Sequence, residues 1–393
     1  MTYSIGSSLI ISAYVCLNSL IYICSGLGLK KEDKPHLKKH IVELISKNAK
    51  VNKVRNATPK GILLINNLPL GYVKNGSVDY TYYIQQAIDN HQILIFPNFP
   101  LLVNDNGLNI PSNRTLIFEE GSVILLRPTD KTFYNIFNIE NVSNVILHNP
   151  KIIGDRDYHL GEKGEAGCGI GIRGSNNITV NNGKISNCWG DGIYIGQYKK
   201  KYGSKNIVIK NTILDRNRRD GISIISVDNL LMENLTASNS NGAEPMAGIN
   251  FEPNNSDCVM SKIRVLNPIT KNNAMFGIQI GIRRMLGNGS RVADIFIQNH
   301  VDKGSAKSAF KVVCVSRFEP SVGTMSANIK VLNPFWENPK SGFPVYFSTN
   351  QPKFRVSIVG PKVLSNGRAL SKPGINKLLN IDYKGRSAFS LVQ

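Results

Sequence analysis

The chain has 393 residues, of which 41% are hydrophobic and 19% are charged. These values are typical of a folded globular protein, so they exclude a chain that is disordered throughout. The 47 basic residues outnumber the 27 acidic ones and leave a formal net charge of +20. A charge of this size indicates an anionic partner, such as an acidic polysaccharide, a nucleic acid or a membrane surface, and does not specify the fold.

The N-terminal part of the chain differs in composition from the rest. Residues 1–29 carry no charged side chain and are largely apolar between Leu9 and Tyr22. This pattern predicts a signal peptide or a membrane anchor, and with it a secreted, periplasmic or cell-surface protein. Residues 30–60 carry ten basic and three acidic side chains, which is typical of a solvated basic linker.

Residues 61–112 are predicted to form an N-terminal capping segment. Within it, residues 79–89 place Ile84, Ala87 and Ile88 at helical spacing, and Asp79 can cap the helix. A strand at residues 93–97 follows and ends at a proline. We expect the helix to cover the open end of a solenoid, whose edge otherwise exposes unpaired backbone groups.

A short phrase then recurs at nearly regular intervals along the chain. It alternates apolar and variable positions, as a short strand does. The five copies are Cys168-Gly-Ile-Gly-Ile, Asp191-Gly-Ile-Tyr-Ile, Asp220-Gly-Ile-Ser-Ile, Ala247-Gly-Ile-Asn-Phe and Phe276-Gly-Ile-Gln-Ile. Their spacing falls in the range that is typical of a solenoid, in which each repeat buries its apolar residues against the next.

A second phrase, which begins with asparagine, runs in step with the first. Its copies are Asn113-Arg-Thr-Leu-Ile, Asn144-Val-Ile-Leu-His, Asn177-Ile-Thr-Val-Asn, Asn206-Ile-Val-Ile-Lys, Asn229-Leu-Leu-Met-Glu and Asn328-Ile-Lys-Val-Leu. Two strand columns per repeat, with turn residues and no helical pattern between them, predict an all-β fold. We expect a right-handed parallel β-helix over residues 113–350, with a C-terminal strand and tail at residues 351–393.

From the helix and the Ile93-Leu-Ile-Phe-Pro97 strand onward, the chain resembles the pectate-lyase-like superfamily of right-handed β-helix proteins. The resemblance covers roughly residues 61–350. Gly154-Asp-Arg-Asp-Tyr-His159 and Cys188-Trp-Gly-Asp-Gly-Ile-Tyr-Ile-Gly196 are similar to motifs of a bacterial and phage group of this fold. Members of the superfamily include polysaccharide hydrolases, lyases, epimerases and phage tailspikes, and the fold alone does not choose among them.

Three acidic residues are candidates for catalysis. The isoleucines of the repeat face the interior, so the alternate positions face outward. Asp191 and Asp220 stand at the same place in neighbouring repeats, about 4.8 Å apart along the stack, so we expect mutual repulsion to raise the pKa of one of them. Glu252 follows one repeat later. A neutral acid beside a carboxylate is the pair that acid/base chemistry needs.

Further candidate residues accompany these acids. Asp157 and His159, in a loop one repeat earlier, are candidates for proton transfer. Sugar-binding candidates combine aromatic rings, an amide and cations that attract an acidic sugar; they are Arg173, Trp189, Tyr194, Arg218, Arg219 and Asn250.

Each candidate also has a structural interpretation. Asp-Gly pairs are common turn residues, so Asp191 and Asp220 can serve only to shape bends. The asparagines that begin the second phrase are expected to form ladders at turns. Asp155, Asp157, Asp191 and Glu252 have the oxygen chemistry of Ca²⁺ ligands, but no compact calcium-loop spacing is present, so we expect neither a metal nor another cofactor.

Three functions remain open at this point. A glycoside hydrolase would use Asp191, Asp220 and Glu252 as acid, base or nucleophile. A polysaccharide lyase or C5-epimerase would use an arginine to neutralise a uronate carboxylate while a base removes the adjacent proton. A non-catalytic adhesin or spike would only bind glycan. In each case the predicted partner is a polysaccharide of anionic character rather than a nucleic acid, and the protein is a monomer or a homotrimer.

Overall fold

The structure is a computed structural model that describes residues 61–287, 289–315, 323–337 and 340–392. The chain divides into two units, residues 1–60 and 61–393, and only the second is described. The predicted signal peptide or anchor at 1–29 and the basic linker at 30–60 therefore lie outside the described residues. Within the described residues, no helix is long and apolar enough to cross a membrane.

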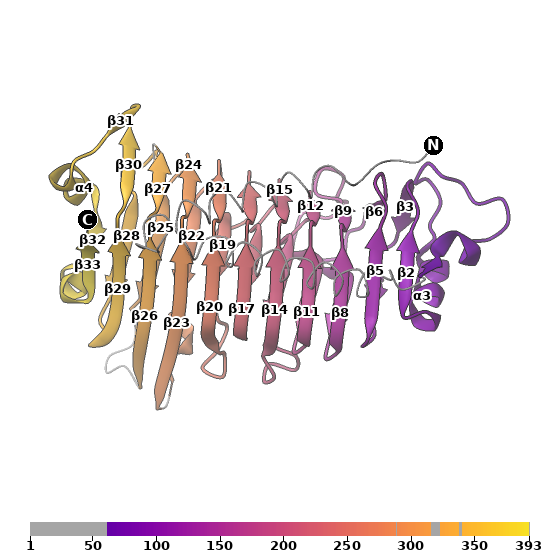
Figure 1. The fold of residues 1–393 in the computed structure, drawn as a ribbon, viewed down its shortest axis with the longest axis horizontal. Helices are drawn as coiled ribbons and strands as arrows, with labels where there is room; N and C mark the ends of the chain where they lie inside the picture. The colour runs from indigo at the N-terminus through magenta and orange to yellow at the C-terminus, as the bar shows by residue number, and fades with distance from the viewer. Residues whose placement is uncertain (1–60, 288, 316–322, 338–339, 393) are drawn as a thin grey trace, which may run out of the picture. The chain divides into compact units, whose positions relative to one another are not determined.

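Residues 61–392 form three sheets of stacked strands (Figure 1). Among the described residues, sheet A has 12 strands: β1 (Ile62–Leu63), β2 (Ile93–Phe96), β5 (Arg114–Phe118), β8 (Ser143–His148), β11 (Asn176–Asn181), β14 (Ser204–Lys210), β17 (Val227–Glu233), β20 (Met260–Leu266), β23 (Ser290–Gln298), β26 (Thr324–Leu332), β29 (Lys353–Val359) and β33 (Phe389–Val392). Sheet B has 11: β3 (Pro100–Val103), β6 (Val123–Leu126), β9 (Lys151–Ile153), β12 (Lys184–Ser186), β15 (Ile213–Asp215), β18 (Thr236–Ser238), β21 (Ile269–Lys271), β24 (Val301–Lys303), β27 (Phe335–Glu337), β30 (Lys362–Ser365) and β31 (Arg368–Ala369). Sheet C has 10: β4 (Leu108–Asn109), β7 (Phe133–Glu140), β10 (Ala166–Arg173), β13 (Ile193–Gly196), β16 (Ile222–Ile224), β19 (Ala247–Phe251), β22 (Phe276–Gly281), β25 (Ser308–Cys314), β28 (Val345–Thr349) and β32 (Asn380–Ile381).

The chain visits the sheets in the order A, B, C and then repeats, so that one coil contributes one strand to each sheet. Neighbouring strands of a sheet come from successive coils and pair in parallel, as β10 does with β13 and β13 with β16. An antiparallel pair joins β30 to β31 at the C-terminal end. The predicted all-β parallel β-helix is therefore confirmed.

The Gly-Ile-x-Ile phrase forms sheet C and fills the interior. Ile170, Ile193, Ile222, Ile249 and Ile278 stand in register, and each is fully buried. Burying one such side chain contributes about 1.5–3 kcal/mol. A column of identical residues therefore stabilises every coil against the next and fixes the strand register, because a slip by one residue would turn the isoleucines outward.

The prediction of two strand columns per repeat is wrong, because the structure has three. The asparagine phrase forms sheet A, and the additional sheet B follows it after a short turn. Most sheet B strands have only three residues, with a single buried side chain in the centre, such as Ile185 in β12 and Leu214 in β15. One apolar residue shows no periodicity, so these strands are not distinguishable from a turn in the sequence.

The β-helix extends beyond the predicted residues 113–350 at both ends. Helix α3 covers Thr81–Asn90, and Asp79 accepts a hydrogen bond from the Thr81 backbone N–H at 2.9 Å. The strand that follows it, β2, already pairs with β5 in sheet A, so the first coil lies inside the predicted capping segment. The predicted C-terminal tail contains helix α4 (Lys372–Leu378) and the strands β32 and β33, which pair with the preceding coil. The 3-10 helices are η1 (Leu64–Asn67), η2 (Arg283–Met285) and η3 (Tyr383–Ala388).

The predicted asparagine ladders are confirmed at the start of sheet A. Asn144, Asn177, Asn206 and Asn229 all have a positive φ, between 53° and 68°. Each donates its side-chain amide to an asparagine of the preceding coil at 2.8 Å. Asparagine tolerates the left-handed region better than other residues with a Cβ, and its amide can bond to the next coil in addition.

We expect Asn206→Ala to lower the free energy of unfolding by about 1–2 kcal/mol, because alanine carries the left-handed backbone penalty without a compensating amide. Asn206→Gly removes the same ladder bonds but relieves the backbone, so its loss should be smaller. Denaturant titration of both variants measures the difference. Equal losses would show that the ladder bonds, rather than the backbone conformation, select asparagine here.

Candidate functional site

The outward positions of sheet C form a polar column beside the carboxylates. Tyr194, Ser223, Asn250, Gln279 and Lys311 stand in register on five successive coils. This is the face that the alternation of the repeat predicts to be outward. Among the described residues, three pockets have lining residues in this column, and two of them are lined by Glu252. We call the smaller of these two, of about 220 Å³, the carboxylate pocket, and the larger one, of about 760 Å³, the basic groove.

Arg219 is the centre of the carboxylate pocket. Its Nη1 donates to both oxygens of Asp191 at 3.3 Å and to Asp220 Oδ2 at 3.0 Å. Its Nη2 donates to Glu252 Oε2 at 2.5 Å. The three predicted catalytic acids, which come from three different coils, thus surround one guanidinium. Sequence reasoning assigned Arg219 to substrate, whereas the structure shows it bound to these acids.

Asp220 lies at the bottom of this cluster and is fully buried. Its Oδ1 accepts the backbone N–H of Ala247 at 2.8 Å, and its Oδ2 accepts the Asn250 amide at 2.9 Å and the Ser223 hydroxyl at 3.0 Å. Both oxygens are occupied, and no surface of the side chain reaches the pocket. Asp220 is therefore placed to position Arg219 and Asn250 rather than to contact a substrate.

Asp191 and Glu252 lie nearer the surface than Asp220. Both line the carboxylate pocket together with Glu165, whose Oε2 is 4.0 Å from Arg219 Nε. The side chains of Asp191, Glu252 and Glu165 are 3%, 25% and 61% exposed. Sequence reasoning missed Glu165, which precedes the first repeat phrase in a loop without any pattern. The pocket therefore offers carboxylates at three depths.

The pKa of Asp191 and that of Asp220 are both raised. Burial is the main cause for each, and the charge of Arg219 opposes it. The Asp191 charge adds to the rise at Asp220, as the stacked column predicted, but it is a smaller effect than burial. A raised pKa makes a carboxyl a better holder of a proton at a given pH, which is the property that an acid catalyst needs.

Arg173 and Tyr194, which were predicted to bind substrate, line the same pocket. Arg173 pairs with Glu140 at 2.9 Å and lies over the Tyr194 ring, 4.4 Å from its centre. Phe133, a residue missed by sequence reasoning, adds a second ring 5.3 Å from the same guanidinium. The carboxylate pocket is therefore lined by two aromatic rings, which both lie against one guanidinium, as well as by the carboxylates. Asn250, which was also predicted to bind substrate, is instead fully buried and lines neither pocket; its amide donates to Asp220 and Glu252.

His159, Trp189 and Arg218 form a separate group. His159 Nδ1 is 2.7 Å from Asp155 Oδ2, and both side chains are inaccessible to solvent. The imidazole stacks on Trp189 with ring centres 3.9 Å apart, and Arg218 lies 3.9 Å from the same indole. The three predicted site residues thus contact one another, and none of them lines the carboxylate pocket or the basic groove.

Asp157 also lies apart from the carboxylate pocket. It is exposed and pairs with Arg216 at 3.1 Å. The four acidic residues considered as Ca²⁺ ligands therefore contact three different residues and do not converge on one point. Asp155 pairs with His159, Asp157 with Arg216, and both Asp191 and Glu252 with Arg219. Within the described ranges, no group of three or more His, Cys, Asp or Glu side chains has a metal-binding arrangement. The absence of a cofactor stays a prediction.

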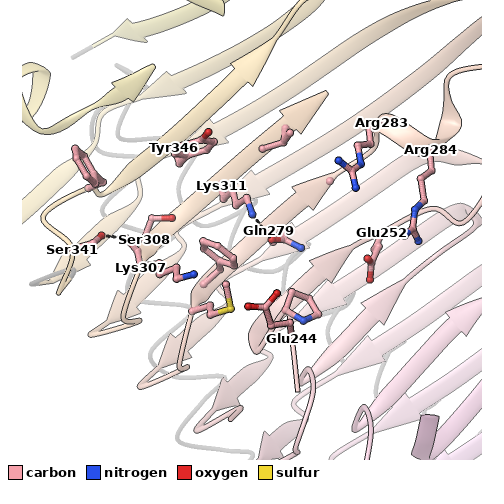
Figure 2. Close-up of a pocket in the computed structure, with 16 residues that line it drawn as sticks. Glu244, Glu252, Gln279, Arg283, Arg284, Lys307, Ser308, Lys311, Ser341 and Tyr346 are labelled. Carbon is pink, nitrogen blue, oxygen red and sulfur yellow. Dashed lines mark hydrogen bonds between the residues drawn. The ribbon is translucent and has the colours of Figure 1, made fainter. Parts of the chain in front are cut away.

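The basic groove was not predicted. It lies over β22, β25 and β28 and is lined by four cations, Arg283, Arg284, Lys307 and Lys311 (Figure 2). Of these four cations, Lys311 stands in the outward column of sheet C, whereas Arg283, Arg284 and Lys307 lie in the connections between strands. Such connections carry no periodic signal, so the sequence does not show that they converge.

Comparisons with known proteins agree with this architecture. The family model for the right handed beta helix region matches residues 98–288, which confirms the fold class expected from the sequence. The chain is also similar to the SPbeta prophage-derived uncharacterized protein YorA of Bacillus subtilis (strain 168), with 32% identity over 162 residues. That match covers 37% of this chain and only 28% of YorA.

Solved structures share the fold at low sequence identity. PfbA, a surface adhesin of Streptococcus pneumoniae, superposes with a TM-score of 0.51 at 15% identity and covers 77% of this chain and 88% of its own. A second solved structure is that of a 1,3-alpha-1,4-beta-D-galactose-4-sulfate-3,6-anhydro-D-galactose-2-sulfate 4 galactohydrolase. It superposes with a TM-score of 0.54 at 16% identity, and the match covers 71% of this chain and 72% of the galactohydrolase chain. An adhesin and a glycan hydrolase thus share this architecture, so function has to come from the site.

Proposed function

We propose that this protein binds and hydrolyses an acidic polysaccharide along the outward face of sheet C. One observation carries the proposal: Asp191 and Glu252, both bound by one arginine, line a single pocket together with the rings of Phe133 and Tyr194. Aromatic faces suit the apolar side of a sugar ring. Two carboxyl groups of different environment on either side of a glycosidic bond are the usual requirement for hydrolysis.

The environments assign the two roles. Burial raises the pKa of Asp191, so this residue is the general acid that gives its proton to the leaving glycosidic oxygen. Glu252 is more exposed and accepts hydrogen bonds from Arg219 and from Asn250, at 3.1 Å in the latter case. As an acceptor it takes the proton of the attacking water, or attacks the anomeric carbon itself. Arg219 and the buried Asp220 hold both groups in position.

A non-catalytic glycan-binding protein is the second candidate. It is favoured by the fact that Arg219 satisfies Asp191, Asp220 and Glu252 at once, because structural ion clusters also perturb pKa values. In that case the carboxylates only stabilise the coils, and the rings and cations of the outward face bind glycan without cleaving it. A lyase or C5-epimerase, in which an arginine neutralises a uronate, is the remaining enzymatic alternative.

A product assay separates these functions. We expect incubation with a panel of acidic and neutral polysaccharides to release new reducing ends from an acidic one. Reducing ends without the ultraviolet absorbance of an unsaturated uronate indicate a hydrolase, and absorbance indicates a lyase. Binding without any product would replace the proposal by the glycan-binding alternative. A polysaccharide partner outside the cell also agrees with the predicted export of the chain.

A further inference from the structure

We propose that the basic groove, which adjoins the carboxylate pocket at Glu252, is a second subsite that binds a carboxylate or sulfate group of the polysaccharide. The inference deepens the proposed function and rests on it for the polysaccharide. Of the three arginines expected to attract an acidic sugar, Arg173 is paired with Glu140 and Arg219 is bound to the three acids. The third, Arg218, lies against Trp189 outside both pockets. The charge that remains to bind an anion therefore lies elsewhere on the same face.

The groove holds an excess of unpaired positive charge. Arg283, Arg284, Lys307 and Lys311 line it, against two acids, Glu244 and Glu252. Glu252 is already bound by Arg219. The salt bridges found within the described residues use other cations than these four. A cavity of about 760 Å³ with four such cations is large enough for a sugar unit and complementary to its anionic substituent.

Lys311 is held in place by a chain of hydrogen bonds. Its Nζ donates to Gln279 Oε1 at 2.9 Å, and Gln279 Nε2 donates to Asn250 Oδ1 at 3.0 Å. Asn250 in turn donates to Asp220 and Glu252. The ammonium also lies 4.1 Å from the centre of the Phe276 ring. These contacts fix Lys311 without neutralising it, so the subsite is preorganised and is connected to the carboxylate pocket.

Partial burial of Lys311 strengthens its interaction with an anion that binds beside it. Burial lowers the pKa of Lys311 to about 8, and the positive charge of Lys307 adds to the decrease. Glu244 and Glu252 oppose this decrease but do not cancel it, so an anion that enters the groove adds negative charge where the ammonium is still undercompensated. A charge-assisted hydrogen bond in a partly desolvated site is worth more than one at the surface.

The spacing and the mixed charge favour a glycan over a nucleic acid. Lys311 lies in register two strands beyond Asn250, which corresponds to about 10 Å along the stack. Glu244 and Glu252 interrupt the positive charge, so a chain with a phosphate on every unit would meet repulsion. Phe343 and Tyr346, 40% and 37% exposed, offer rings at the far side of the groove. A polysaccharide that carries anionic groups only on some of its sugar units fits a groove in which cations, acids and aromatic rings are mixed.

The test compares two double variants in a binding assay. Lys307→Met with Lys311→Met neutralises the groove, and Lys271→Met with Lys303→Met removes the same charge from adjacent exposed positions on sheet B. The probes are polygalacturonate, dextran sulfate, neutral dextran and single-stranded DNA, at one ionic strength. We expect the groove variant to lose about tenfold or more in affinity for one or both anionic glycans, which is the value of one charge-assisted hydrogen bond. The sheet B variant should match the wild type.

The two glycan probes identify the anionic group as a carboxylate or a sulfate. Equal losses in both double variants, or no loss in the groove variant, would overturn the subsite, since net charge alone would then explain binding. Tighter binding of single-stranded DNA than of either glycan, lost only in the groove variant, would also overturn it. The assay measures binding, so it is independent of the cleavage test. If the wild type cleaves no polysaccharide, only the proposed function is contradicted. If the wild type cleaves but the groove variant binds with unchanged affinity, only the subsite is contradicted.

Discussion

Replacing Arg219 by methionine is expected to lower the free energy of unfolding by about 3–5 kcal/mol at pH 7, as is usual when one partner of a buried ion pair is removed. The guanidinium is 13% exposed and contacts three carboxyl groups, of which Asp191 and Asp220 are almost completely buried. Without it these acids keep their desolvation cost and lose the charge that offsets it. Denaturant unfolding measures the loss.

The loss in Arg219→Met should shrink as the pH falls. Burial already raises the pKa of Asp191 and Asp220 in the folded state, and removal of the opposing charge raises both further. A raised folded-state pKa contributes stability that is present below the unfolded pKa and is lost as the pH rises through the folded one. The variant should therefore approach the wild type near pH 4 and differ most above pH 7. A loss that does not change with pH would contradict the cluster's electrostatic role.

Arg216→Met is the matched control for this prediction. Arg216 pairs with Asp157 at 3.1 Å, but the two side chains are 54% and 41% exposed. Exposed ion pairs contribute about 0–1 kcal/mol because solvent screens them. Both substitutions remove one guanidinium, so the difference between the two variants measures what the buried three-carboxyl cluster adds to an exposed ion pair.

The sequence predicted the parts of the fold that repeat. Five copies of one phrase placed the isoleucines inside, the alternate residues outside, and Asp191 and Asp220 at equivalent turns, and the register of sheet C agrees. The same alternation placed Tyr194 and Asn250 on one face. These features follow from a period and from the two faces of a strand, which are properties that a single sequence carries.

The features that the sequence did not predict depend on side-chain direction in loops. Arg218 and Arg219 are adjacent and alike in sequence, yet Arg218 packs on Trp189 while Arg219 binds the acids. Arg283 and Lys307 belong to different connections between strands and line one groove. No periodic signal in the sequence indicates that Arg218 and Arg219 have different partners, or that Arg283 and Lys307 line the same groove. The direction of a loop side chain depends on contacts with residues that are distant in sequence.

Glu252→Gln and Asp191→Asn are each expected to lower the turnover of the polysaccharide by about 10²–10⁴-fold, the usual contribution of a positioned acid or base. Substrate affinity should change much less, because the rings and the basic groove remain. The pH profile distinguishes the roles: loss of the acid Asp191 should flatten the alkaline limb, and loss of the base Glu252 the acidic one. Initial rates of reducing-end release across the pH range measure both effects.

Glu233→Gln supplies the matched control for this last pair of variants. Glu233 is a half-buried carboxylate on sheet A that pairs with Lys210 at 2.9 Å, so the same chemical change is made away from the carboxylate pocket. It should leave turnover unchanged. If Asp191→Asn and Glu252→Gln also retain wild-type turnover, the carboxylates are a structural cluster around Arg219. Because all three substitutions change the net charge equally, a loss confined to the two pocket variants is not an effect of net charge.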